Sequence, residues 1–360
     1  PGDGHQRLLP RRRRHGRLRR LSPESRHHVE RRLVLPLADA RARYMAAKTV
    51  SLPEHVLIPG LVNLHCHAAM TLMRGLADDL PLMRWLQEAI WPTEARHASH
   101  AFVRDGSLLA GAEMLRGGIT TCNDMYFFPE AAAEAFDRLG LRAVLGITLL
   151  EFPSQYAADA DDYLRKGLAT HDAWRDHPLI RFTLAPHAPY TVSNTSFERI
   201  GALADELELP IHIHLHETAG EIADSLRDFG QRPITRLESL GILGPNLIGV
   251  HAVHLAPEDI ERLAVHQCAI APCPTSNMKL ASGAAPITRL LDHGLAVGLG
   301  SDGAASNNRL DLFREMHQAS LLAKLSTGDA SALPARQTLR MATLNGARAL
   351  GLDKDIGSLL

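Results

Sequence analysis

Short apolar runs alternate with amphipathic stretches along the chain from about residue 57. Each run is rich in aliphatic or β-branched residues and ends in polar ones, which is typical of a buried strand. The runs cover residues 57–67, 118–125, 142–150, 180–187, 210–217, 247–254, 268–274 and 295–302. Strands that alternate with helices at this spacing predict parallel βαβ units. Eight such units predict a closed (β/α)8 barrel of the α/β class, a TIM barrel.

A doubly wound open sheet is the alternative fold for a chain that alternates strands and helices. Such sheets often carry a G-x-G-x-x-G phosphate-binding motif at the first turn from strand to helix. No such motif follows the first predicted strand, residues 57–67. The sequence therefore favours the closed barrel.

Polar and ionisable side chains gather where the predicted strands end. His65 and His67 are two residues apart in the first run, so they face the same side of a strand. The later strands end, in chain order, in Asn123 and Asp124, His187, His214 with His216 and Glu217, His251 with His254, and Ser301 with Asp302. Barrel enzymes have their active sites at this end of the strands. The pattern therefore predicts one catalytic site there.

The histidines at these ends indicate a metal site. Two imidazoles on one strand face are hard to satisfy unless an ion binds both, and imidazole is a good ligand of divalent metals. The segment HIHLHE, residues 212–217, offers further histidines of one facing, and Asp302 offers a carboxylate. Three histidines and one aspartate with a free position for water are typical of a catalytic metal site. Alternation alone does not choose between His214 and His216.

The formal net charge of −1 conceals an uneven distribution. Residues 1–43 contain 13 Arg, no Lys and four acidic residues, so they carry +9 and the remainder carries −10. Residues 1–44 show no strand or helix pattern. We interpret them as a disordered or non-native segment rather than as an arm that binds nucleic acid.

Composition indicates in which cellular compartment the protein is expected. No run of 18 apolar residues predicts a membrane span, and the arginine-rich start has no apolar core of a signal peptide. The four cysteines form no C-x-x-C pair, which predicts reduced thiols in a cytoplasmic protein. We therefore expect neither a membrane nor a nucleic-acid partner.

Six motifs carry a family resemblance: PGLVNLHCHAAMTLMRGLADDLPLMRWL, APHAPYTVS, HIHLHETAGEI, PTSNMKLASG, GLGSDGAASNN and ATLNGARALG. Together they resemble the amidohydrolase superfamily, and within it the 5′-methylthioadenosine/S-adenosylhomocysteine deaminases, an adenosine-type deaminase family. The resemblance covers roughly residues 50–358. It implies a nucleoside substrate whose adenine ring is deaminated by water, giving an inosine-type product and ammonia, in a homo-oligomeric enzyme.

The resemblance implies a role for each residue at the strand ends. The residues that match the family's metal ligands are His65, His67, His214 and Asp302. Glu217 matches the general acid/base, and His251 matches the residue that positions or polarises the reacting water. Asp302 would also shuttle a proton, while His216 and His254 would be structural.

The resemblance extends to substrate contacts and to the metal. Trp85 and Glu94 resemble residues that line the nucleoside pocket, with Glu94 accepting hydrogen bonds from the ribose. His187 resembles a residue that reaches the substrate, and Ser306 is a further candidate contact. We expect one divalent metal, Zn²⁺, with Fe²⁺ or Mn²⁺ as alternatives. A single metal is expected because His187 stands where a two-metal relative would carry a lysine.

Family members normally add a small β-sandwich to the barrel, and here it is expected to be incomplete. Residues 45–56 would be its remnant, residues 57–350 the barrel, and residues 351–360 the truncated start of its C-terminal segment. Alternatives to the nucleoside deaminase are another amidohydrolase, such as a guanine deaminase or a triazine-type hydrolase, and an inactive truncated product. The sequence does not rank 5′-methylthioadenosine, adenosine and S-adenosylhomocysteine.

Overall fold

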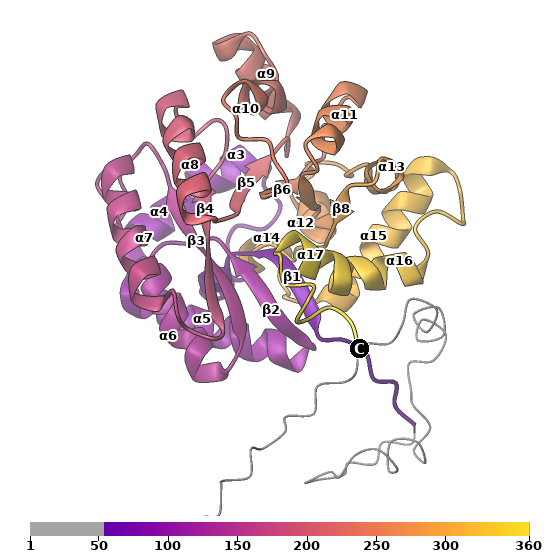
Figure 1. Ribbon diagram of the computed structural model, residues 1–360, viewed down its shortest axis with the longest axis horizontal. Helices are drawn as coiled ribbons and strands as arrows, with labels where there is room; N and C mark the ends of the chain where they lie inside the picture. Colours follow the sequence, from indigo (N-terminus) through magenta and orange to yellow (C-terminus); the bar gives the residue numbers. More distant parts are fainter. Residues whose placement is uncertain (1–53, 360) are drawn as a thin grey trace, which may run out of the picture. The chain divides into compact units, whose positions relative to one another are not determined.

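The structure, a computed structural model, describes residues 54–359. The chain divides into two compact units, residues 1–58 with 358–360, and residues 59–357. All the strands and helices described below belong to the second unit (Figure 1). The arginine-rich segment 1–44 and most of the predicted sandwich remnant, residues 45–56, lie outside the described residues.

Eight parallel strands form one sheet in chain order. They are β1 (Leu61–Cys66), β2 (Ile119–Asp124), β3 (Arg142–Leu149), β4 (Ile180–Pro186), β5 (Ile211–Leu215), β6 (Leu247–His251), β7 (Ala269–Ala271) and β8 (Ala296–Val297). Each lies within one of the predicted runs, so all eight predicted strands are confirmed. The observed strands are shorter than the runs: β1 begins at Leu61 rather than at residue 57, and β8 ends at Val297 rather than at residue 302.

Backbone hydrogen bonds bring the two edges of the sheet together. The Leu64 amide donates to the Leu299 carbonyl at 2.8 Å, and the Asp302 amide donates to the His65 carbonyl at 3.0 Å. The segment that follows β8 therefore runs beside β1, and Figure 1 shows the strands surrounded by helices. The predicted TIM-barrel fold is confirmed. The described residues contain no strand besides these eight, so they show no accessory β-sandwich.

The helices follow the strands along the chain. They are η1 (Ala68–Met73, 3₁₀), α3 (Leu82–Trp85), η2 (Leu86–Ile90, π), α4 (Trp91–His97), α5 (His100–Arg116), α6 (Pro129–Leu139), α7 (Ala160–Trp174), α8 (Asn194–Leu207), α9 (Ala219–Phe229), α10 (Pro233–Ser239), α11 (Pro257–Val265), α12 (Pro274–Lys279), α13 (Ile287–Asp292), α14 (Ala304–Asn307), α15 (Leu312–Thr327), α16 (Ala335–Arg340), η3 (Met341–Asn345, π) and α17 (Gly346–Ala349). Five of them start at a side chain that accepts a hydrogen bond from an amide of the first turn, the usual reason for a helix to begin there. These caps are Ser99, Asp159, Ser193, Thr218 and Asp311.

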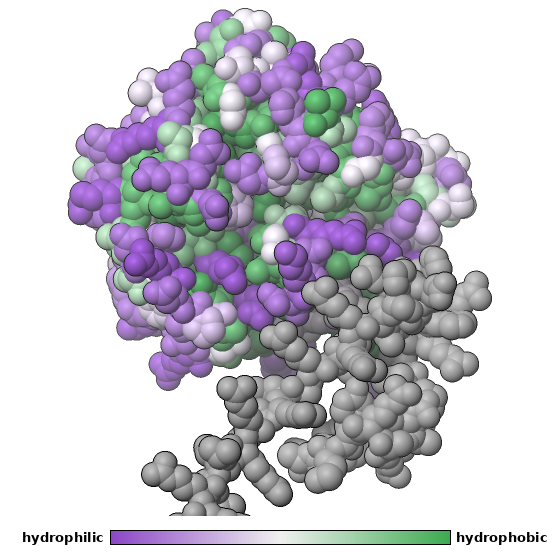
Figure 2. Space-filling view, viewed as in Figure 1, coloured by the Kyte–Doolittle hydropathy of each residue, from purple (hydrophilic) through white to green (hydrophobic). Residues whose placement is uncertain are grey.

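The strands supply the core. Every residue of β1 is buried, and its apolar side chains Val62 and Leu64 pack in one cluster with residues of β6, β7 and α17. Leu352 and Ile356 pack in or against the same cluster, so the chain after α17 contributes to the barrel core. The four cysteines are buried and unpaired. Polar side chains cover much of the face seen in Figure 2, with apolar ones visible between them.

None of the helices in residues 54–359 is long and apolar enough to span a membrane.

The close approach of α5 to η1 yields a stability prediction. A Cβ atom on Gly106 would lie 2.5 Å from the Ala69 carbonyl oxygen and 2.9 Å from its Cα. Alanine normally stabilises a helix relative to glycine, but here the contact is with backbone that cannot yield easily. We expect Gly106→Ala to lower the free energy of unfolding of the metal-free protein by about 1–3 kcal/mol in urea titrations.

Gly201→Ala is the matched control because Gly201 also lies within a helix, α8. There a Cβ would meet only the flexible end of Ile242, at 3.4 Å. This variant should be neutral or more stable by up to about 1 kcal/mol. A Gly106→Ala protein as stable as the Gly201→Ala protein would contradict the tight contact.

Candidate metal centre and active site

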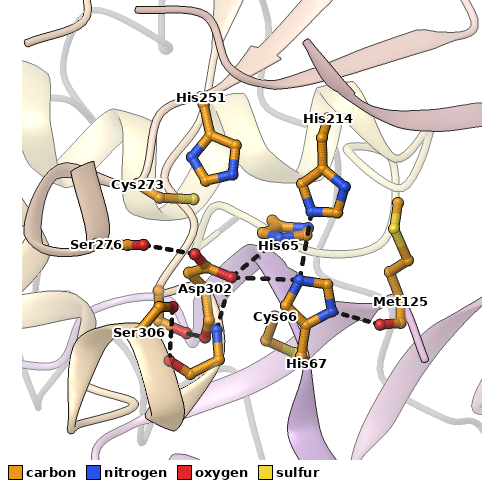
Figure 3. A network of polar contacts seen from close by, with 12 residues as sticks. His65, Cys66, His67, Met125, His214, His251, Cys273, Ser276, Asp302 and Ser306 are labelled. Atoms are coloured by element: carbon orange, nitrogen blue, oxygen red, sulfur yellow. Dashed lines mark hydrogen bonds and ion pairs between the residues drawn. The ribbon is translucent and has the colours of Figure 1, made fainter. Parts of the chain in front are cut away.

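Five side chains from the ends of four strands point toward one another (Figure 3). His65 and His67 come from the end of β1, His214 from β5, His251 from β6, and Asp302 from the loop after β8. The Asp302 Oδ1 atom lies 3.4 Å from His65 Nε2 and 3.3 Å from His67 Nε2. The Nε2 atoms of His67 and His214 are 3.3 Å apart. The structure thus brings together all four predicted ligands and the predicted catalytic histidine.

Three of these imidazoles use their Nδ1 atoms to donate to an oxygen. The pairs are His67 with Met125 O (2.5 Å), His214 with His187 O (2.8 Å) and His251 with Asn277 Oδ1 (2.8 Å). An oxygen of this kind only accepts, so each Nδ1 carries a proton. In the form with a single ring proton, each Nε2 atom turns a lone pair toward the centre.

This arrangement fits a bound cation. The Nε2 atoms of His67 and His214 face each other at 3.3 Å, while the Nδ1 atoms of both rings donate to carbonyl oxygens. His65 Nε2 is buried and has no hydrogen-bond partner among the described residues. His65, His67 and Asp302 have ligand atoms within 4.8 Å of one another, as do His65, His214 and His251. Nitrogen donors joined by one carboxylate are typical of a catalytic divalent metal.

The electrostatics of the site keep these groups in the protonation states that a metal requires. Burial lowers the pKa of His65 to about 3 and that of His214 well below its ordinary value, so both rings are neutral. Burial alone would raise the pKa of Asp302, but the His65 imidazole, whose Nε2 lies 3.4 Å away, and the nearby His67 and His251 hold it well below its usual range. Neutral imidazoles and an ionised carboxylate are the forms that bind metals.

Left-handed backbone turns follow three of the strands. His216, His251 and Asp302 have φ values of 53°, 69° and 59°. Such a conformation costs about 1–3 kcal/mol in a residue other than glycine, and it is common at functional sites. The turn re-aims each side chain at the strand end.

The turn at His216 separates this residue from the site. Its ring accepts a hydrogen bond from the Ile234 amide at 3.2 Å and contacts the His254 carbonyl at 3.1 Å. His214, which precedes the turn, keeps the facing of an inward strand residue. Strict alternation along a strand would place His214 and His216 on the same side. The positive φ at His216 turns its side chain away, so only His214 faces the centre.

Glu217 lies beside the centre and is held by a second glutamate. Its Oε2 is 3.7 Å from His251 Nε2, and burial raises the pKa of its carboxyl. The carboxylate of Glu221 accepts hydrogen bonds from the His216 and Glu217 amides, both at 2.8 Å. Sequence reasoning missed Glu221. The stretch TAGE, in which Thr218 caps α9, carried a signal because Ser/Thr-x-x-Glu is typical of a helix start.

Residues of α12 and the loop after β8 hold Asp302. The Ser276 hydroxyl donates to Asp302 Oδ2 at 2.6 Å, and the Gly303 amide donates to Oδ1 at 2.8 Å. Ser276 and Asn277 both come from the motif PTSNMK, whose spacing alone assigns neither a role. Ser306 donates to the Gly303 carbonyl and does not line the cavity beside the site, so its substrate contact remains a prediction without support from the lining.

A cavity extends from the histidines toward α3, η2 and α4. It is lined by the predicted contacts Trp85, Glu94 and His187, and by aromatic residues that include Tyr126 and Trp91. The side chains of the metal centre that line it are His67, His214, His251 and Asp302. Burial raises the pKa of Glu94 to about 7. The Tyr126 pKa is raised by burial and by the charge of Glu94, which places the two side chains together. His187 is neutral because burial lowers its pKa to about 3.

The comparisons with known proteins agree with this geometry. The profile of the Amidohydrolase family matches residues 56–360. The chain belongs to the amidohydrolase family. A protein of Teredinibacter turnerae named 5-methylthioadenosine/S-adenosylhomocysteine deaminase is 49% identical over 326 residues, which are 91% of this chain and 74% of the relative. A 5′-deoxyadenosine deaminase of Methanothermobacter thermautotrophicus is 46% identical over 83% of this chain and 70% of its own length.

A solved structure points the same way. The crystal structure of an adenosine deaminase from Xanthomonas campestris with bound zinc has a TM-score of 0.88 and 50% sequence identity, and covers 90% of this chain and 74% of that one. The predicted family resemblance and enzyme class are confirmed: the chain is a metal-dependent hydrolase acting on a C–N bond.

Matched leucine variants test whether His214 faces the metal centre while His216 does not. We expect His214→Leu to lose far more zinc affinity than the about 10- to 100-fold typical of an outer-shell change. His216→Leu should keep zinc affinity but destabilise the protein by about 1–3 kcal/mol, because the buried Ile234 amide loses its acceptor. Chelator competition and urea unfolding measure the two effects. Equal loss of zinc from both variants would contradict the assignment of His214.

Proposed function

We propose that the chain catalyses the hydrolytic deamination of the adenine ring of 5′-methylthioadenosine and related nucleosides, including adenosine and S-adenosylhomocysteine. The observation that carries the proposal is a buried carboxylic acid, Glu217, beside a metal-ligand cluster at the end of an aromatic cavity. The names of the relatives support the same reaction and the same class of nucleoside.

We propose that His65, His67, His214 and Asp302 hold one divalent metal, Zn²⁺. Fe²⁺ and Mn²⁺ suit the same donors. The zinc in the similar adenosine deaminase structure supports this choice of metal. When bound, the metal would lower the pKa of water at the site and so supply a nucleophile near neutral pH.

The protein side chains would manage the protons of the reaction. Glu217 has a raised pKa and so can hold a proton and give it to ring N1 as water adds at C6. Asp302, whose carboxylate is ionised, would accept a proton from the water. His251, fixed by Asn277, would orient that water. Asp302 would pass that proton to the amino group, ammonia would leave as the C6–N bond breaks, and the proton of the C6 hydroxyl would return to Glu217, which leaves the inosine-type product.

The cavity would hold the nucleoside through the predicted contacts. Trp85 offers an aromatic face and Glu94 offers a carboxylate that can accept hydrogen bonds from the ribose hydroxyls. His187 presents a neutral ring, whose Nδ1 lies 3.0 Å from the Thr191 hydroxyl. The predictions of a cytoplasmic homo-oligomer without nucleic-acid or membrane partners remain predictions, and light scattering tests the oligomeric state.

The reaction can be followed by ultraviolet absorbance. Zinc-loaded protein should convert the adenine spectrum of 5′-methylthioadenosine to that of hypoxanthine. Glu217→Gln should lower kcat by about 10²- to 10⁴-fold, because the proton donor to N1 is lost. Turnover that survives the substitution would contradict the role of Glu217.

A substrate panel separates the proposal from its alternatives. A guanine deaminase would convert free guanine and ignore ribosides, and a triazine-type hydrolase would accept chloro- or amino-triazines. Activity on either of these, with none on 5′-methylthioadenosine or adenosine, would overturn the nucleoside assignment. A folded, zinc-loaded protein that turns over none of them would favour an inactive product.

The pKa of Glu94 predicts a pH dependence of binding. Below about pH 7 this carboxyl is largely protonated, and ionisation above that value restores full acceptor capacity. The affinity of the Glu217→Gln protein for 5′-methylthioadenosine should therefore rise by up to about tenfold from pH 6 to pH 8. Calorimetry measures the affinity without turnover. In a protein that also carries Glu94→Gln, the affinity should no longer change with pH. If the pH dependence persisted, another group would be responsible for it.

A further inference from the structure

Another buried histidine, His212, lies next to the metal centre. His212 is on β5, two residues before His214, and it is completely buried. Its Nε2 atom is 3.0 Å from the Nδ1 atom of His65, and the two rings meet edge to face at a centroid distance of 5.0 Å. The reaction proposed above gives His212 no role.

The partner of His65 differs from those of the other site histidines. His67, His214 and His251 face oxygen atoms, which leave the imidazole proton on Nδ1. His212 is itself an imidazole, so its Nε2 accepts or donates according to its tautomer. If His212 Nε2 carried a proton, His65 Nδ1 would have to accept it, and the proton of neutral His65 would lie on Nε2. That atom could then bind no metal.

Ligation through His65 Nε2 therefore requires one arrangement of protons in this pair. His65 Nδ1 donates to His212 Nε2, and the proton of neutral His212 lies on its own Nδ1. That Nδ1 atom is buried and has no hydrogen-bond partner in the described part of the chain. An unpaired buried donor costs about 1–3 kcal/mol, which an aliphatic side chain at this position would avoid. Packing alone thus does not explain a histidine at position 212. The need of His65 Nδ1 for a hydrogen-bond acceptor does explain it.

We propose that His212 is a positioning residue, which fixes the Nδ1–H tautomer and the ring orientation of His65 so that His65 Nε2 faces the metal. The inference rests on the metal site proposed above. Outer partners of ligating histidines typically account for 10- to 100-fold in metal affinity.

Two substitutions distinguish the role of His212 as a hydrogen-bond acceptor from its role in filling space. His212→Leu fills the space but offers no acceptor, so its zinc affinity should fall by about 10- to 100-fold in a chelator competition. His212→Gln offers an amide oxygen to His65 Nδ1 and should retain affinity close to that of the wild type. A space-filling role predicts the reverse order, because glutamine would bury an amide that lacks partners.

Thr183→Val is the matched control. Thr183 lies on the neighbouring strand β4, is fully buried, and its hydroxyl has no hydrogen-bond partner within residues 54–359. Its zinc affinity should equal that of the wild type. An equal fall in the Val and Leu variants would indicate general loosening of the barrel interior and would overturn the inference.

Nitrogen-15 NMR of the zinc-loaded wild type tests the tautomer without any substitution. The inference can therefore be tested even if the His212→Leu protein does not fold. His65 should show a protonated Nδ1, and His212 a protonated Nδ1 with an unprotonated Nε2. A proton on His212 Nε2 would overturn the inference, as would a folded Leu variant with wild-type zinc affinity. A wild-type chain that binds no zinc would instead overturn the proposed metal site, and this inference with it.

Discussion

The site depends on one constraint: three histidine nitrogens and one carboxylate oxygen must be held close together inside the barrel. The Nε2 atoms of His65, His67 and His214 lie close to one another or to Asp302, and water is largely excluded from them. Without a cation the lone pairs would repel, so the surrounding protein must hold the rings in place. It does so through fixed acceptors on Nδ1 and through the barrel itself, since the Asp302 amide donates to the His65 carbonyl.

Buried carboxyl groups hold the loops that carry this centre. Glu221 binds two successive amides at the turn after β5, and Glu315 of α15 accepts hydrogen bonds from the Thr275 amide and the Asn307 side chain. Burial raises the pKa of each of these two glutamates to about 7. Each replaces backbone hydrogen bonds that the irregular strand ends cannot make among themselves. Loop geometry and metal geometry are therefore coupled through a few polar contacts.

The position of the cavity follows from the same architecture. The barrel brings the ligands to one end of the sheet, while the segment from α3 to α4 supplies the aromatic and acidic lining around Trp85 and Glu94. The metal-ligand cluster and the aromatic and acidic lining of the cavity thus come from different parts of the chain. This division is usual in barrels, where rigid strand ends carry the chemistry and the loops carry specificity.

The sequence by itself determined the features that depend on local periodicity. Alternation placed His65 and His67 on one face of a strand, and the spacing of apolar runs predicted all eight strands and the closed barrel. Position at a strand end also identified His187, His251 and Asp302, because parallel strands must end together. These inferences needed no contact between distant residues.

Tertiary structure decided the rest. Alternation left His214 and His216 equal, and only the family resemblance named His214; the physical reason is one positive φ at His216, which breaks the alternation. The contacts of His212, Ser276 and Glu221 join residues through side-chain directions that no linear pattern encodes. The same holds for the hydrogen bond that Ser306 donates to the Gly303 carbonyl. Periodicity fixes the face of a strand on which a side chain lies. Which atoms meet across the barrel depends on the register and turns of separate strands, and these exist only in the folded chain.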